Sequence, residues 1–401
     1  MVNFAIIKSL FSHLVSSMSS YLMRVILIPS SVFLSVMFGG AFGSGQEVVQ
    51  FMSGHGPYGG IVSMITIGLV YAICLFLCFE FARKFKAYDY RSFFKVLLNK
   101  GWFCYEILIM LGLVVALAIC ATAAGTIAKD HFGYETIYGS AALLMIVVVL
   151  NYLGRKYVES SMIYSVVALA IILIYLFFDV MLDDNYRNII VTKFAEDTLT
   201  QQTFLDSVFT GLKYGFSNSG FIPLVIYCAI QLKTRKEALI AACIAGYVAI
   251  SPAISFHTIF MIGYPEIVGQ ELPSYWILEK IESALFIDLY VSVVFIMIAQ
   301  TGVGLLQGFV ERIDSYNVEK RGKKLSSFGH ALVSTVLFFA SIWLASIGLM
   351  NLVAKGYTFF SASFFIFFFI PLFSYGVYLI FLKKTQVSEQ LVLDKTQTEL
   401  L

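Results

Sequence analysis

The residues best suited to chemistry lie in one apolar stretch, VFLSVMFGGAFGSGQEVVQFM at positions 32–52. Four glycines fall within seven positions of it: Gly39, Gly40, Gly43 and Gly45. Each glycine weakens a helix by about 1 kcal/mol relative to alanine, so this density predicts a break. Glu47 follows at once. Its carboxylate can pair a substrate ammonium, take up a proton or hydrogen-bond the unwound chain.

Composition defines the environment in which this stretch must work. The chain has 401 residues, of which 59% are hydrophobic and only 13% charged, with a mean hydropathy of +0.85. Soluble domains are about 25% charged, so we expect an all-α polytopic membrane protein with the lipid bilayer as its main surroundings. The net charge of +2 gives no indication of a nucleic-acid partner. The six cysteines lie in apolar segments, which favours packing roles over disulfides or a metal site.

Hydrophobic runs of about 20 residues predict ten transmembrane helices. Their ranges are 24–53, 59–83, 101–128, 136–153, 160–180, 205–232, 237–263, 285–312, 328–353 and 358–382. With a cytoplasmic N-terminus, 21 of the 27 Lys and Arg residues fall on the inner side, as the positive-inside rule requires. We therefore expect a multi-pass protein of the cell (inner, cytoplasmic) membrane, with both termini cytoplasmic.

The predicted organisation has five parts. They are a cytoplasmic N-terminal segment (1–23), a first five-helix repeat (24–180), an extracellular loop (181–204), a second five-helix repeat (205–382) and a cytoplasmic tail (383–401). Residues 84–100 pair aromatics with lysines and predict a short helix on the inner surface. Residues 265–284 mix apolar and acidic residues at helical spacing and predict an extracellular cap.

The sixth predicted span carries an interruption of its own, YGFSNSGFIP at 214–223. Five is an odd number of spans, so the second half enters the membrane from the opposite side and the two halves form a 5+5 inverted repeat. Interruptions at corresponding positions of inverted halves point to a transporter's central site. The predicted substrate-binding residues are Gly39, Gly40, Ala41, Phe42, Gly43, Ser44, Gly45, Glu47, Tyr105, Phe216, Ser217, Asn218 and Ser219.

This arrangement resembles the LeuT-like fold of the amino acid–polyamine–organocation superfamily. Within it, GGAFGSGQE at 39–47 is similar to the first-helix motif of the YkvI-like bacterial membrane proteins. The resemblance implies a secondary transporter with helices 1 and 6 broken around the substrate and helices 3 and 8 completing the pocket. It also implies Na⁺ between helix-1 carbonyls such as that of Gly40 and hydroxyls on helix 8. Helix 8 offers Thr301 without an adjacent serine, so coupling stays open between Na⁺ and H⁺.

Individual side chains permit two interpretations each. Glu106 can serve coupling or form an interfacial ion pair; Asn218 can bind ligand or satisfy freed backbone. Gln300 and Thr301 can contact an ion or substrate, or bond between helices. His257 can relay protons or be a packed, hydrogen-bonded residue. Four aromatics could form a wall for a cation: Tyr71, Tyr105, Phe216 and Phe221.

The predicted function is symport of a small amino acid or related zwitterionic or cationic amine. The acids Glu47 and Glu106 favour a substrate that carries an ammonium group. The alternative is a sensor that binds a ligand on the same scaffold without transporting it. No GxxxxGK[ST], HExxH or GxSxG motif occurs, so neither ATP drive within this chain nor an enzyme is expected, and no cofactor beyond a possible Na⁺. The sequence sets no oligomeric state.

Overall fold

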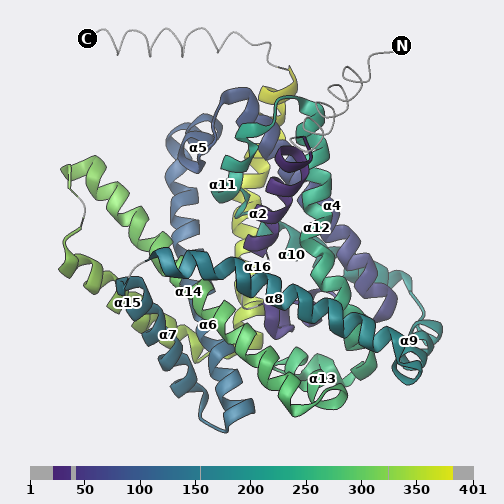
Figure 1. The fold of residues 1–401 in the computed structure, drawn as a ribbon. Coiled ribbons are helices and arrows are strands. Elements are labelled where there is room, and N and C mark those ends of the chain that lie inside the picture. Colours follow the sequence, from purple (N-terminus) through teal and green to yellow (C-terminus); the bar gives the residue numbers. More distant parts are fainter. Residues whose placement is uncertain (1–20, 38–41, 154, 324, 383–401) are drawn as a thin grey trace, which may run out of the picture.

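The computed structural model describes residues 21–37, 42–153, 155–323 and 325–382, and every regular element in these ranges is helical (Figure 1). The α-helices are α2 (Ile28–Met37), α3 (Gln46–Phe51), α4 (Gly56–Phe85), α5 (Tyr90–Leu98), α6 (Trp102–Phe132), α7 (Thr136–Leu153), α8 (Arg155–Leu182), α9 (Asp184–Glu196), α10 (Gln201–Ser219), α11 (Ile222–Val225), α12 (Arg235–Phe260), α13 (Pro273–Ile281), α14 (Ala284–Arg321), α15 (Ser327–Ala345) and α16 (Leu349–Phe364). A π-helical segment, Leu22–Leu27, precedes α2, and three more follow α16: Phe365–Phe369, Leu372–Gly376 and Tyr378–Leu382.

Six helical segments are long and apolar enough to cross a membrane by length and composition. They are Gln46–Phe85, Tyr90–Phe132, Arg235–Gly263, Ala284–Val318, Phe328–Ala345 and Leu349–Leu382. Shorter apolar helices cover Leu22–Met37, Thr136–Val149, Val167–Leu182 and Ile222–Gln231. Together with α10, these elements account for all ten predicted spans. The chain is an all-α, multi-pass membrane protein, as predicted.

One predicted boundary was wrong. The ninth span was expected to run to residue 353, but α15 ends at Ala345 and α16 begins at Leu349 after Gly348 adopts φ +87°. The apolar sequence continues through this joint, so hydropathy alone did not mark it. Within the predicted extracellular loop 181–204 the chain forms α9, and the Asp183 side chain caps its first turn.

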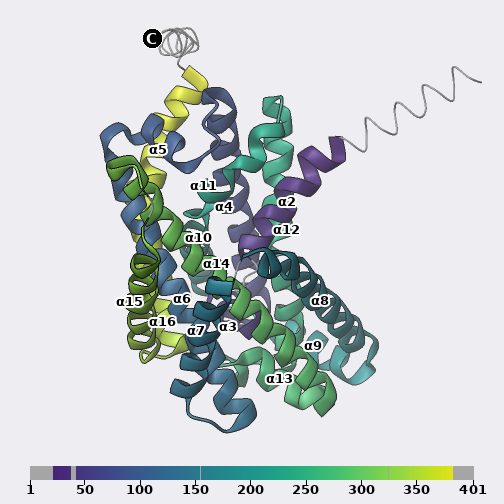
Figure 2. The same cartoon turned by 60° about the vertical axis from the view of Figure 1, so that its left-hand side comes forward.

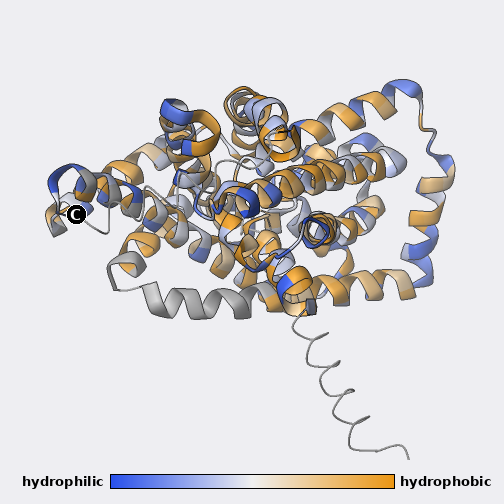
Figure 3. Ribbon diagram, turned by 90° about the horizontal axis from the view of Figure 1, so that it is seen from above, coloured by the Kyte–Doolittle hydropathy of each residue, from blue (hydrophilic) through white to orange (hydrophobic). Residues whose placement is uncertain are grey.

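The outward surfaces show why lipid must surround the bundle. On α4, Ile65, Leu69 and Ile73 recur every four residues and are each about half exposed. Such a spacing places them on one helix face. Figure 3 shows hydrophobic residues along most of the helices, including those at the edge of the bundle. Apolar faces of this kind are stable against hydrocarbon and costly in water.

Helices α10 and α12 pack closely against α4. A Cβ at Gly211 of α10 would lie 2.8 Å from the Ser63 carbonyl oxygen of α4, and a Cβ at Gly215 would lie 2.9 Å from the Val70 Cβ. On α12, a Cβ at Gly246 would lie 2.8 Å from the Ala72 backbone nitrogen. Small residues at helix contacts let backbones approach, which is a main source of association in lipid. Helices α4, α10 and α12 therefore form a tight three-helix unit.

The bundle has two distinct ends. Both ends of the described chain lie at the same end of the molecule as α5, whereas α9 and α13 lie at the opposite end (Figures 1 and 2). Helix α5 is capped by Asp89 and buries Phe93, Phe94 and Leu97. The predicted surface helix and the helical cap at 265–284 thus exist and lie at opposite ends. Which end faces the cytoplasm remains a prediction.

A group of ion pairs joins three elements at the α5 end; we call Arg24, Glu80, Arg83, Arg235 and Glu237 the basal cluster. Arg24 donates to both Glu237 carboxylate oxygens at 2.7 and 2.8 Å. The fully buried Glu80 accepts from Arg83 at 2.8 Å and from Arg235 at 3.0 Å. The cluster links the start of the first span, the end of α4 and the start of α12. It stabilises these elements where the helices leave the apolar core.

Replacing Arg24→Ala is expected to lower the free energy of unfolding by about 1 to 3 kcal/mol, because Glu237 loses its charged donor while staying largely buried. Arg187→Ala is the matched control, since its partner Asp184 is 82% exposed, and it should change stability by less than about 0.5 kcal/mol. Thermal unfolding of the detergent-purified variants measures both. Equal effects would contradict a stabilising role for the basal cluster.

Candidate functional site

The first span is interrupted as predicted. Helix α2 ends at Met37, and a 3₁₀ turn over Phe42–Ser44 leads into α3 at Gln46. Gly39, Gly40 and Ala41 of the predicted site lie outside the described residues. Gly45 adopts φ +78°, and a Cβ there would lie 2.6 Å from Cζ of Phe260. Only glycine adopts this conformation without strain and leaves room for the ring.

The chain freed at this break finds partners on two other elements. The Gly43 carbonyl oxygen accepts a hydrogen bond from Ser274 Oγ of α13 at 2.8 Å and another from the Tyr290 hydroxyl of α14. A cavity of about 10 Å³ lies beside it, lined in part by Ser44 and Val294. That volume holds about one water molecule. The hydroxyls of Ser274 and Tyr290 therefore satisfy the Gly43 carbonyl oxygen, for which lipid offers no hydrogen-bond donor.

The second break lies slightly further along the chain than its motif suggested. The segment Phe216-Ser217-Asn218-Ser219 forms the last turn of α10, and the helix is interrupted only at Gly220 and Phe221. Tyr105 of α6 donates its hydroxyl to the Gly220 carbonyl oxygen at 2.9 Å. Phe364 of α16 occupies the space that a Gly220 side chain would need. This break, like the first, has a carbonyl capped by a buried tyrosine.

Glu47 lies just past the first break, contacts α10, the helix that leads to the second break, and is only 6% exposed. The Tyr214 hydroxyl of α10 donates to its Oε2 at 2.6 Å, and the Tyr357 hydroxyl of α16 also interacts with the carboxylate. Tyr214 and Tyr357 stack with their rings 5.3 Å apart and nearly parallel. Tyr71 of α4 and Asn218 complete the group. We call these five residues the Glu47 cluster.

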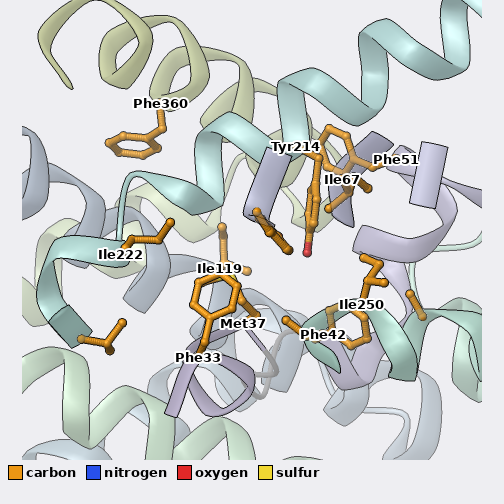
Figure 4. Close-up of a cluster of buried hydrophobic side chains, with 14 of the residues drawn as sticks. Phe33, Met37, Phe42, Phe51, Ile67, Ile119, Tyr214, Ile222, Ile250 and Phe360 are labelled. Carbon is orange, nitrogen blue, oxygen red and sulfur yellow. The ribbon is translucent and has the colours of Figure 1, made fainter. Parts of the chain in front are cut away.

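Apolar side chains from both breaks enclose this cluster. Figure 4 shows Phe33 and Met37 of α2, Phe42, Tyr214 and Ile222 in one group. They belong to a continuous buried core. Described side chains next to the two interruptions therefore belong to one buried core.

Other predicted site residues have different neighbours. Phe216 packs against Phe365, Phe369 and Phe373 after α16, so the predicted aromatic wall is divided between two places. Ser217 and Ser219 are buried near the end of α10. Gln300 is buried and Thr301 half-buried on α14.

Glu106 and His257 each have hydrogen-bond partners on other elements. Glu106 accepts from Arg312 of α14 at 3.1 Å, which makes an ion pair, and from the Tyr90 hydroxyl at 3.2 Å. His257 Nδ1 lies 2.9 Å from Ser53 Oγ, and Nε2 lies 3.0 Å from the Pro57 carbonyl oxygen. The carbonyl can only accept, so Nε2 carries the hydrogen and the ring is satisfied as a neutral imidazole.

Sequence reasoning missed Tyr214 and Tyr357 as partners of Glu47. Tyr214 precedes Asn218 by one helical turn, a spacing that could have placed both on one face. Tyr357 carried no such signal. Among the described residues, no group of three or more His, Cys, Asp or Glu could hold a metal ion.

No protein-family model matches the sequence, and no curated protein matches it. Solved structures share its fold. MhsT in complex with L-phenylalanine superposes with a TM-score of 0.61 at 14% identity, over 90% of each chain. The Eremococcus coleocola manganese transporter, in complex with an aromatic bis-isothiourea substituted compound, gives a TM-score of 0.55 at 12% identity, over 89% of this chain and 79% of that one. These are LeuT-fold proteins, and the predicted LeuT-like fold is confirmed.

Gly45→Ala is expected to destabilise the protein by about 2 to 4 kcal/mol, because the new methyl group meets the Phe260 ring in a left-handed conformation. The matched control is Gly133→Ala, at φ +73° with open space around it. It should cost only about 1 to 2 kcal/mol, which is the conformational part alone. Thermal unfolding measures the difference. Equal costs would show that the break does not depend on close contact with Phe260.

Proposed function

We propose that this protein is a secondary active transporter for a small amino acid or related zwitterionic or cationic amine, driven by Na⁺ or H⁺. The observation that carries the proposal is a buried carboxylate, Glu47, that lies just past one helix interruption and contacts the helix that leads to the second. Interrupted helices at mid-membrane are tolerated where they line a protein-enclosed site. In transporters of this architecture, they form the substrate and ion sites.

Fold likeness supports the same proposal. MhsT was solved with L-phenylalanine, and the Eremococcus coleocola protein is a manganese transporter. The GGAFGSGQE motif favours the YkvI-like proteins as the family. The proposed substrate site comprises the chain at 39–45 together with Glu47, Tyr105 and the end of α10. Alternating access at this site, with both termini cytoplasmic, completes the proposal.

The charges favour an ammonium-bearing substrate. Arg312 already pairs with Glu106. Among the described residues, the groups that hydrogen-bond Glu47 are the neutral hydroxyls of Tyr214 and Tyr357. A buried carboxylate gains most from a positively charged partner or a proton. A zwitterion would place its ammonium toward Glu47, whereas a purely anionic substrate would be repelled by an ionised Glu47.

A thermal-unfolding screen of amino acids, amines and betaines tests this, with Na⁺ or K⁺ and at two pH values. A ligand at 100 times its dissociation constant should stabilise the folded state by about 2.7 kcal/mol. Glu47→Gln is expected to abolish that stabilisation, whereas Asp184→Asn, at an exposed position of α9, should retain it. Counterflow of the labelled hit in liposomes then measures transport.

Two results would contradict the proposal. Binding of a purely anionic metabolite that survives Glu47→Gln would overturn the substrate class. Binding of an amine without counterflow would indicate a sensor in place of a transporter.

A further inference from the structure

The surroundings of Glu47 consist of groups that both donate and accept hydrogen bonds. A carboxylate can only accept, whereas a phenol hydroxyl can do either. Tyr214 donates to Glu47 at 2.6 Å, within the range of a charge-assisted bond, and Tyr357 interacts with the same carboxylate. With Glu47 ionised, both phenols can donate. With Glu47 protonated, the carboxyl can donate to a phenol oxygen, so the cluster accommodates either state.

Protonation of Glu47 displaces the hydrogen bond that Tyr214 donates to it, and the Tyr71 hydroxyl oxygen offers Tyr214 a second acceptor. When Glu47 donates to the Tyr214 oxygen, the Tyr214 O–H must turn to another acceptor. Tyr71 lies within hydrogen-bonding reach of Tyr214 and Asn218 and is fully buried. Its oxygen can accept from Tyr214. The added proton stays on Glu47 throughout, and no phenol ionises.

The groups around Glu47 suit the binding of a proton better than the binding of a metal ion. The groups facing the carboxyl from the packed elements are Tyr71 of α4, Cys120 of α6, Tyr214 of α10 and Tyr357 of α16. His257 of α12 is engaged with Ser53 and Pro57. Hydroxyl hydrogens directed at a carboxylate occupy the lone pairs that a metal ion would need. A proton requires only one of them.

We propose that Tyr214 and Tyr357 are positioning residues that make Glu47 a reversible proton site and tie its protonation state to α10 and α16. Their stacked rings hold both hydroxyls against one carboxylate. Glu47 lies two residues after the first break, and Tyr214 lies one and a half turns before the second. Protonation would therefore redirect the hydrogen bonds that join the two interrupted helices. This inference rests on the proposed function only for its use in transport.

Infrared difference spectra of the full chain in liposomes, recorded between acidic and alkaline pH, test the proposal with the proton itself as the probe. We expect a carbonyl-stretch band of a protonated carboxyl that is absent in Glu47→Gln. Tyr214→Phe and Tyr357→Phe should each move that band to a different frequency, because each removes a hydrogen bond to the carboxyl. Tyr247→Phe removes the same hydroxyl from a position that is 43% exposed and should leave the band unchanged.

The outcomes separate this proposal from the transporter proposal, since no substrate is needed. A missing Glu47-dependent band would overturn it, and so would a Glu47 band that neither tyrosine variant moves. If one tyrosine variant does not fold, the infrared band of the other variant tests the proposal. A band that behaves as expected in a protein without transport would sustain the proton site and contradict the transport function alone.

Discussion

Interrupting a helix inside a membrane exposes backbone groups for which lipid offers no partner, and the rest of this structure is arranged around that constraint. Both interruptions are resolved by tyrosine hydroxyls from other helices. Tyr290 bonds the Gly43 carbonyl, and Tyr105 bonds the Gly220 carbonyl. The phenol is suited to this task because its ring packs in an apolar core while its hydroxyl donates at the end of a rigid arm. At each break, a side chain from a continuous helix therefore hydrogen-bonds one backbone carbonyl.

Local composition made the breaks and the spans predictable. Glycine-rich and small-residue segments inside apolar runs identify where a helix must be interrupted, and the basic residues support a count of ten spans. The same local signals failed at the joint before α16, where apolar sequence runs on through Gly348. They also did not indicate α9, a polar helix whose order comes from its Asp183 cap and from packing outside the hydrophobic spans.

The chemistry of the candidate site was predictable only in part. Glu47 could be identified because a carboxylate beside a broken membrane helix is costly unless it is used or satisfied. Its partner Tyr214 lies 167 positions away along the chain, and Tyr357 comes later still. Both belong to aromatic-rich segments in which any one tyrosine looks ordinary. Glu106 and His257 show the converse, since the ion-pair partner Arg312 and the hydrogen-bond partner Ser53 are visible only once the helices are packed together.

The glycine contacts between α4 and its neighbours have a mechanical consequence. Where backbones meet without intervening side chains, one helix cannot slide past another without collisions between main-chain atoms. Helices α10 and α12 are thus each held in register against α4, and the basal cluster pairs the start of the first span with the start of α12. Bending in such an assembly concentrates at its joints, of which Gly220–Phe221 is one.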